Sequence, residues 1–197
     1  MKKTLIIVEG MDNTGKDTLI SGIKKSLTYG TFDEQHFTGP SKYKDSTCAF
    51  IEQVNQFVDK TNKLATLQDD LTIWNRSHIG EYVYGQVYRN IDKKIIIKLI
   101  NLIDELLLSL DIDIVYVQLI CKSNELMIKN EDGKSLSKSI KDKEKYINAI
   151  NNERNLFMDA YNVVSDKFKK IMIVVNDGDE FISKKEILDK VIRKIYE

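Results

Sequence analysis

Short apolar runs alternate along this chain with longer segments in which apolar residues recur at helical spacing. A short apolar run is typical of a buried strand, whereas recurrence every three or four residues is typical of an amphipathic helix. The runs predict five strands, at 2–9, within 34–40, and at 71–74, 112–120 and 171–175; the segment 34–40 is a short strand followed by a turn. The periodic segments predict helices at 16–27, 43–67, 77–90, 92–110 and 183–196. Strands that alternate with helices indicate an α/β fold with a mainly parallel, five-stranded sheet flanked by helices.

One stretch, 129–145, departs from this pattern because it is polar, charged and poor in large apolar residues. It is either a solvated loop that leads into a helix or a mobile lid over a phosphate site. A phosphate site elsewhere in the chain would favour the lid.

The length and composition are those of one globular domain, which we place at 1–197. Lys plus Arg and Asp plus Glu each number 30, and this balance argues against a dedicated nucleic-acid binder. The two cysteines, Cys48 and Cys121, lack metal-ligand spacing and are expected to be reduced thiols of a cytoplasmic protein. Apolar runs are too short for a membrane span, so no membrane partner is expected.

The first predicted strand and the first predicted helix are joined by a phosphate-binding pattern. Gly10, Gly15 and Lys16 have the spacing Gly-x-x-x-x-Gly-Lys. Backbone N–H groups in such a turn point at phosphate oxygens, and the lysine reaches the β- and γ-phosphates. This context predicts a three-layer P-loop fold that uses ATP and Mg²⁺. The predicted ATP-binding residues are Gly10, Met11, Asp12, Asn13, Thr14, Gly15, Lys16, Asp17 and Thr18.

Asp17 occupies the position where the pattern normally has a Ser or Thr that ligates Mg²⁺. A carboxylate is also a suitable oxygen ligand for Mg²⁺, which makes Asp17 the candidate metal ligand. Two alternatives stay open: Asp17 repels the triphosphate and weakens the site, or it only complements the dipole of the following helix. Thr18, one position later, still offers a hydroxyl group to a phosphate.

Arg76 directly follows the third predicted strand. In an open parallel sheet that end faces the same crevice as the phosphate loop. A guanidinium there can bind a phosphate through two parallel hydrogen bonds. The alternative is a surface ion pair with Glu81 or another acid.

These motifs carry a family resemblance over nearly the whole chain. "VEGMDNTGK" (8–16) resembles the opening "FEGxDGxGK" of the thymidylate kinase and deoxynucleoside kinase superfamily, and "NRSHIGEYVYGQVYR" (75–89) resembles its "DRFHLGEYVYxxxYR". The similarity is greatest to short phage and bacterial members. The segment "NEDGKSLS" (130–137) resembles the family's lid more weakly.

The resemblance implies roles for individual residues. Lys16, Arg76, Asp12 and Lys129 would be catalytic, Asp12 near the acceptor and Lys129 in place of a lid-proximal arginine. The implied acceptor-binding residues are Phe37, Pro40, Arg76, Glu81 and Tyr84. Family members commonly dimerise, and the apolar segment 92–110 is the candidate interface of a homodimer.

Several positions depart from the family pattern. Asn75 replaces an acid, Gly85 replaces a glutamine, and Asn13 stands where some members have an arginine. A nucleoside hydroxyl benefits from a carboxylate base, whereas a monophosphate needs an extra cation instead. The absence of the acid at Asn75 therefore favours a deoxynucleoside monophosphate as acceptor. The family resemblance implies dTMP or a related pyrimidine nucleotide.

Other functions stay open. Glu9 and Glu34 are possible bases for a deoxynucleoside kinase or for a kinase of a modified base or DNA. A non-enzymatic nucleotide-binding protein is the third hypothesis. The base of the acceptor would stack on an aromatic side chain, for which Phe50, Phe57 and Trp74 are candidates.

Overall fold

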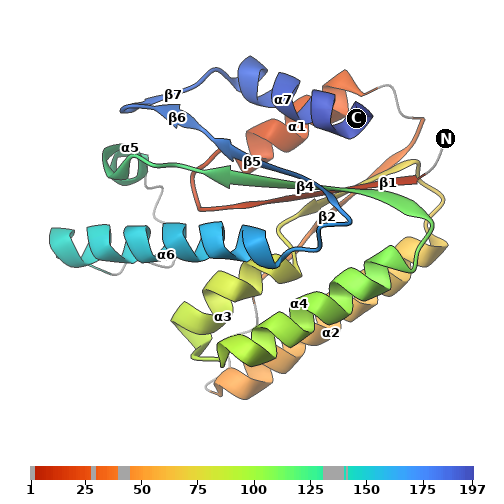
Figure 1. The fold of residues 1–197 in the computed structure, drawn as a ribbon, viewed down its shortest axis with the longest axis horizontal. Helices are drawn as coiled ribbons and strands as arrows, with labels where there is room; N and C mark the ends of the chain where they lie inside the picture. The colour runs from red at the N-terminus through yellow and green to blue at the C-terminus, as the bar shows by residue number, and fades with distance from the viewer. Residues whose placement is uncertain (1–2, 28–29, 40–44, 131–139, 141) are drawn as a thin grey trace.

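The computed structural model of this chain describes residues 3–27, 30–39, 45–130, 140 and 142–197. Its centre is a five-stranded, fully parallel sheet with the strand order β2-β3-β1-β4-β5 (Figure 1). The strands are β1 (Lys3–Gly10), β2 (Phe32–His36), β3 (Leu71–Asn75), β4 (Ile112–Ile120) and β5 (Lys169–Val174). The predicted α/β class is therefore confirmed.

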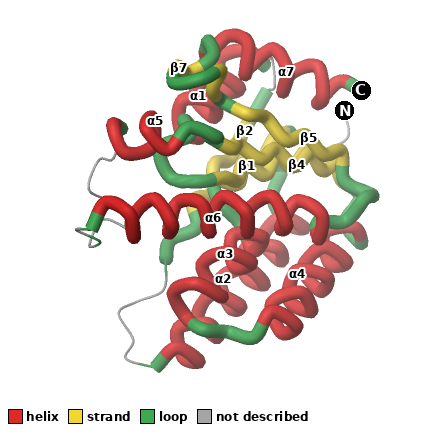
Figure 2. Tube along the Cα trace, turned by 60° about the vertical axis from the view of Figure 1, so that its left-hand side comes forward, coloured by secondary structure: helices red, strands yellow, loops and turns green. Residues whose placement is uncertain are grey.

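Helices cover both faces of this sheet. They are α1 (Lys16–Ser26), α2 (Ser46–Thr66), α3 (Glu81–Arg89), α4 (Lys93–Leu108), α5 (Asn124–Lys129), α6 (Lys143–Val163) and α7 (Lys184–Tyr196), with a short 3₁₀ helix, η1 (His78–Gly80). Helices α1 and α7 lie together on one face, and α2, α3, α4 and α6 lie on the other (Figures 1 and 2). The described helices include none long and apolar enough to cross a membrane.

The alternation of side chains along β1 explains why both faces are covered. Ile6 and Val8 pack with residues of α1 and α7, whereas Leu5 and Ile7 pack with residues of α2 and α4. All four side chains are fully buried. A strand buried on both faces has the continuous apolar sequence seen here.

The structure changes the limits of two predicted elements. The second strand, β2, begins at Phe32, two residues before the predicted segment 34–40, and Phe37 to Gly39 follow the strand, where the turn was predicted. The predicted helix at 77–90 consists of η1 followed directly by α3, and Ser77 caps η1 by accepting a hydrogen bond from the Ile79 N–H.

Two features were not predicted from the sequence. One is α6, a helix of 21 residues. The other is an antiparallel hairpin of β6 (Asn176–Asp177) and β7 (Glu180–Phe181), whose turn contains Gly178 at φ 56°.

The register of the central strands places two motifs side by side. In the pairing of β1 with β3, Val8 is opposite Asn75, and the Arg76 N–H donates to the Val8 carbonyl over 3.0 Å. The phosphate loop leaves β1 two residues after Val8. The loop and Arg76 therefore start from the same edge of the sheet.

Candidate active site

The phosphate loop connects β1 to α1 and begins at a glycine that no other residue can easily replace. Gly10 has φ 141°, and a Cβ atom there would lie 2.2 Å from the Leu119 carbonyl oxygen on β4. Gly15, just before α1, has φ 84° but faces open space. The first glycine thus fits the loop against the sheet, and the second supplies a left-handed turn.

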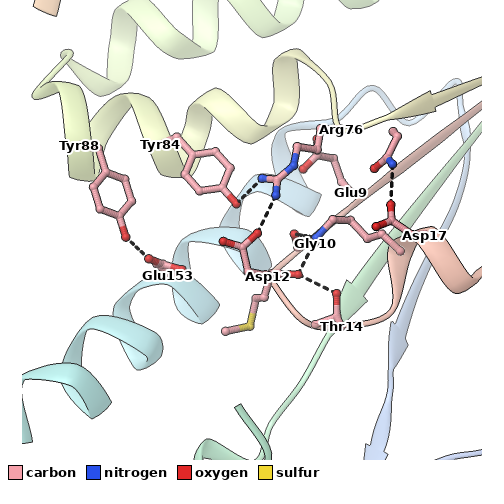
Figure 3. Close-up of polar contacts among 12 residues, drawn as sticks. Glu9, Gly10, Asp12, Thr14, Asp17, Arg76, Tyr84, Tyr88 and Glu153 are labelled. Carbon is pink, nitrogen blue, oxygen red and sulfur yellow. Dashed lines mark hydrogen bonds and ion pairs between the residues drawn. The ribbon is translucent and has the colours of Figure 1, made fainter. Parts of the chain in front are cut away.

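Lys16 is buried and curls back over the loop. Its Nζ donates to the Gly10 carbonyl over 2.9 Å and to the Met11 carbonyl over 2.7 Å. Thr14 Oγ1 donates to the same Met11 oxygen over 2.7 Å (Figure 3). The Met11 side chain is fully buried in the core, so Met11 contributes its backbone alone. Burial, and then the charge of Arg76, lower the pKa of Lys16 to about 8.

Arg76 lies between the phosphate loop and α3. Its backbone has φ 69°, a left-handed conformation that is rare outside glycine. Its Nη2 donates to Asp12 Oδ1 over 2.7 Å, and its Nη1 donates to the Tyr84 hydroxyl over 3.0 Å (Figure 3). The predicted proximity of Asp12, Arg76 and Tyr84 is thus present. The alternative for Arg76 was an ion pair with Glu81 or another acid: Glu81 pairs with Arg89 instead, whereas Arg76 does pair with an acid, Asp12.

Glu9 lies fully buried near Arg76 and fixes the turn in which Arg76 stands. Its carboxylate accepts a hydrogen bond from the Ser77 N–H. Burial raises the pKa of Glu9 to about 7, although the charges of Arg76 and Lys16 oppose the shift. The other possible base, Glu34, forms an ion pair with Lys24 and lines none of the cavities described below.

A cavity of about 560 Å³ extends from Arg76 toward α2 and α3. Four of the predicted acceptor-binding residues line it, namely Phe37, Arg76, Glu81 and Tyr84. The fifth, Pro40, lies outside the described residues. Phe57 also lines the cavity, whereas the other stacking candidates, Phe50 and Trp74, are buried in the core and do not.

Polar residues that the sequence did not single out also line this cavity. Arg89, which forms a buried ion pair with Glu81, is part of its wall, as is Gln53, whose Nε2 is buried without a hydrogen-bond partner among the described residues. Tyr88, also in the wall, donates its hydroxyl proton to Glu153 of α6 (Figure 3). No periodicity marks these residues, because α2, α3 and α6 bring them together.

A second cavity, of about 900 Å³, lies on the other side of the phosphate loop. It is lined by Thr14, Gly15 and Thr18 of the loop and by apolar residues of the C-terminal region, among them Val175, Phe181 and Leu188. Phe181 belongs to the unpredicted hairpin and is 42% exposed. The cavity offers an apolar surface beside the phosphate loop.

A third cavity, of about 430 Å³, contains the loop's charged residues. Asp12, Lys16, Asp17, Asn75 and Arg76 line it, together with Asn13, Gly15, Thr18, His36 and Asn130. Asn75 Nδ2 donates to Asp17 Oδ1 over 2.8 Å, and Figure 3 marks this bond at Asp17. The described residues contain no cluster of three or more His, Cys, Asp or Glu side chains that could hold a metal ion. A magnesium site here would consist of few protein ligands and the phosphates, as is usual for Mg²⁺.

The predicted lid is only partly described. Helix α5 ends at Lys129 and α6 begins at Lys143, while 131–139 and 141 lie outside the described residues. Lys129 is exposed and lines none of the three cavities, although its neighbour Asn130 lines the third. Arg154, the first arginine after this segment, donates to the Cys121 carbonyl over 2.7 Å and to Asn124 Oδ1 over 2.6 Å. It thus fixes the turn between β4 and α5.

Solved structures with the same fold are P-loop kinases. A polyphosphate kinase 2 from Arthrobacter aurescens TC1 has a TM-score of 0.67 and 16% identity, over 99% of this chain and 67% of its own. A deoxyadenosine kinase from M. mycoides with bound dATP has a TM-score of 0.59 and 17% identity, over 98% and 100%. A thymidylate kinase from Ehrlichia chaffeensis has a TM-score of 0.61 and 16% identity, over 99% and 100%. At these identities the likeness establishes the fold.

Sequence comparison gives no further assignment. No family model matches the chain, and no curated protein matches it.

Proposed function

We propose that this protein is a nucleotide kinase, which transfers the γ-phosphoryl group of ATP to a deoxynucleoside monophosphate. The observation that carries the proposal is the position of Arg76, which lines both the cavity of the phosphate loop and the cavity beside α2 and α3. A cation between two cavities is suited to two phosphates that face each other. An acceptor oxygen would attack the γ-phosphorus as the bond to the β-bridging oxygen breaks, releasing ADP.

The residues of the phosphate loop support ATP as donor. Lys16 and the loop N–H groups would hold the β- and γ-phosphates, with Mg²⁺ near Asp17 neutralising their charge. The cavity of about 900 Å³ next to the loop is lined by apolar residues, including Phe181, that suit a nucleobase. Polyphosphate has no base to occupy such a surface, which favours ATP over polyphosphate.

The cavity beside α2 and α3 is the proposed acceptor site. Phe37, Phe57 and Tyr84 supply apolar and aromatic surface, and Glu81 and Arg89 supply polar groups deeper in the wall. The preference for thymine, and the closeness to phage members, rest on the sequence resemblance. Lys129 and the remaining lid residues stay proposed contributors to closure.

A deoxynucleoside is the second candidate acceptor, because Glu9 lines the same cavity. A buried carboxyl group with a pKa of about 7 is suited to accept a proton from a sugar hydroxyl at neutral pH. Its bond with Ser77 argues for a structural role instead.

An acceptor panel tests these proposals. Purified protein with Mg²⁺ and either ATP or polyphosphate would be offered dTMP, dUMP, dCMP, dAMP, dGMP, the matching nucleosides and a DNA oligomer. We expect ATP-dependent formation of a diphosphate from a pyrimidine monophosphate. Turnover of nucleosides alone, abolished in Glu9→Gln, would establish the second candidate. ATP binding without turnover of any acceptor would contradict a kinase.

The homodimer also stays a proposal. Ile95 and Leu102 on α4 are 52% and 49% exposed, which leaves apolar surface on the predicted interface 92–110. Sedimentation of the purified chain and of an Ile95→Asp variant would test it: a dimer that the substitution dissociates is expected, and a wild-type monomer would contradict it.

A further inference from the structure

The two positions at which the chain departs most clearly from the usual chemistry of a P-loop site are bonded to each other. Asp17 brings a carboxylate where a hydroxyl group is usual, and Asn75 lies at the end of β3 where an acid is usual. They are 58 residues apart, yet Asn75 Nδ2 donates to Asp17 Oδ1 over 2.8 Å. In the usual arrangement a hydroxyl donor from the loop faces an acid on the strand. Here the acid is on the loop and the donor is on the strand.

From this contact we infer that Asp17 and Asn75 are an exchanged pair, in which Asp17 supplies the metal-binding carboxylate and Asn75 positions it. The inference rests on the proposed function, since it concerns Mg²⁺ that accompanies ATP. It predicts that neither departure weakens the site, because each compensates the other.

Charge in the third cavity supports this assignment. Asp12 is paired with Arg76, and Lys16 is held by the loop carbonyls. Asp17 forms no ion pair within the described residues, although its charge acts on Lys16, and its side chain lines the cavity from the first turn of α1. A carboxylate beside a triphosphate is repulsive unless a cation lies between them. Mg²⁺, which prefers carboxylate oxygens and phosphates, removes that repulsion.

The burial of the Asn75 side chain independently supports its role in positioning Asp17. The Asn75 side chain is 3% exposed, and its Oδ1 is buried without a hydrogen-bond partner in the part of the chain that the structure describes. The Asn75 amide therefore presents its Nδ2 to Asp17, while its Oδ1 is enclosed away from solvent. A carboxylate oriented by a buried amide is a suitable ligand for Mg²⁺, whose other positions waters and phosphates would fill. The residues present thus fit the ion.

Four variants separate the exchange from simpler roles. Asp17→Asn keeps the shape and the hydrogen-bonding partner but removes the charge. Asp17→Ser leaves the pair without a carboxylate, and Asn75→Asp places two carboxylates together. The double variant Asp17→Ser with Asn75→Asp restores the usual arrangement. Asp159→Asn, which removes an exposed carboxylate on α6, is the matched control.

The primary measurement is binding of Mn²⁺, detected by electron paramagnetic resonance, in the presence of a non-hydrolysable ATP analogue. We expect Asp17→Asn and Asp17→Ser to weaken Mn²⁺ binding by about tenfold or more, which corresponds to ~1.4 kcal/mol. The double variant should recover to within about threefold of the wild type, so the two effects are not additive. Thermal unfolding without metal should show Asn75→Asp destabilised, with stability regained when Mg²⁺ is added.

Two results would overturn the inference: wild-type Mn²⁺ affinity in Asp17→Asn, or a double variant no better than Asp17→Ser. In both cases the analogue would still bind, so the proposed kinase function would stand. If the wild-type protein bound no analogue with or without metal, the proposed function and this inference would both fail.

Discussion

The guanidinium group of Arg76 is bound to the carboxylate of Asp12, with Nη2 and Oδ1 2.7 Å apart. A residue at the end of β3 is therefore attached to the phosphate loop, 64 residues earlier in the chain. An incoming phosphate must share this guanidinium with Asp12 or displace it. The contact keeps Arg76 oriented between the two cavities before any phosphate binds.

Replacement of Arg76 by lysine should impair the acceptor more than the donor. Arg76→Lys keeps the charge but loses the planar donor pair that reaches both Asp12 and Tyr84. We expect turnover to fall by about tenfold or more, with ATP affinity changed by less than about threefold. ATP affinity is measured by titration and turnover by acceptor kinetics. The exposed Arg193→Lys is the control. A loss confined to ATP affinity would place Arg76 in the donor site instead.

Binding of ATP should depend on pH through Lys16. The pKa of Lys16 in the unliganded protein is about 8, and a bound triphosphate stabilises the charged ammonium. Below pH 8 the ammonium is already charged, so affinity should vary little. Above pH 8 binding requires proton uptake, and affinity should fall by up to about tenfold per pH unit. Calorimetry in buffers of different ionisation enthalpy gives the number of protons taken up when ATP binds. Lys16→Arg, which stays charged, should lose this slope, and an equal slope in that variant would assign the proton to another group.

Substitution of Lys16 should abolish phosphoryl transfer. Lys16→Met removes the ammonium and leaves the carbonyls of Gly10 and Met11 without that donor, but keeps a buried chain of similar length. We expect a folded protein, as judged by thermal unfolding, whose turnover is lower by at least about a hundredfold. Near-normal turnover would refute the phosphate-loop assignment.

The stability of the fold should fall as pH rises because of Glu9. Its pKa is about 7 in the folded protein against an ordinary value of 4.5, so between these values the folded state holds a proton that the unfolded state has lost. The contribution of the protonated group is fully present below pH 4.5 and is lost as the pH rises to 7. The loss is on the order of 3 kcal/mol.

Glu9→Gln isolates this effect, because its amide oxygen can still accept the Ser77 N–H. Urea unfolding between pH 5 and pH 8 should show the variant gaining stability relative to the wild type as the pH rises. Parallel stability curves would mean that the carboxyl group keeps an ordinary pKa.

The two loop glycines should respond differently to alanine. In Gly10→Ala the new Cβ would lie 2.2 Å from the Leu119 oxygen, so backbone must move in β1 or β4. Gly15→Ala meets no atom within 4 Å and bears only the strain of φ 84°. We expect a loss of ~1 kcal/mol for Gly15→Ala and at least ~3 kcal/mol for Gly10→Ala. Denaturant unfolding compares them, and equal losses would contradict the close approach of β1 to β4.

The sequence predicted the parts of this molecule that depend on local pattern. The buried strands are apolar throughout, and the phosphate loop is marked by Gly10, Gly15 and Lys16, so both were recognisable. Helix α6 was missed although its buried positions follow helical spacing, because the charged Glu153 interrupts the apolar stripe between Ile150 and Phe157. The hairpin did carry a signal, because its two-residue turn, Gly178-Asp179, is a pair typical of hairpin turns.

Relationships between distant residues were harder to predict. The pairs Asp17 with Asn75, Arg76 with Asp12 and Glu81 with Arg89 depend on strand register and helix packing. From the sequence, Asp17 and Asn75 were two separate anomalies, and only their bond suggests that they compensate each other. Glu9 and Glu34 were both possible bases from the sequence, and only the packing of the strands shows that Glu9 lines the cavity beside Arg76 and that Glu34 does not.

The central place of β1 has a consequence for how this protein is made. The strand precedes both of its neighbours in the chain, because β3 and β4 begin at Leu71 and Ile112. During synthesis β1 is therefore an apolar strand without a partner until β3 follows, and it stays unpaired on its other edge until β4 follows; such strands are prone to aggregate. The phosphate loop gains its fixed shape only when Leu119 arrives to pack against Gly10. A chain arrested before β4 would carry the complete loop motif but lack the packing surface that shapes it.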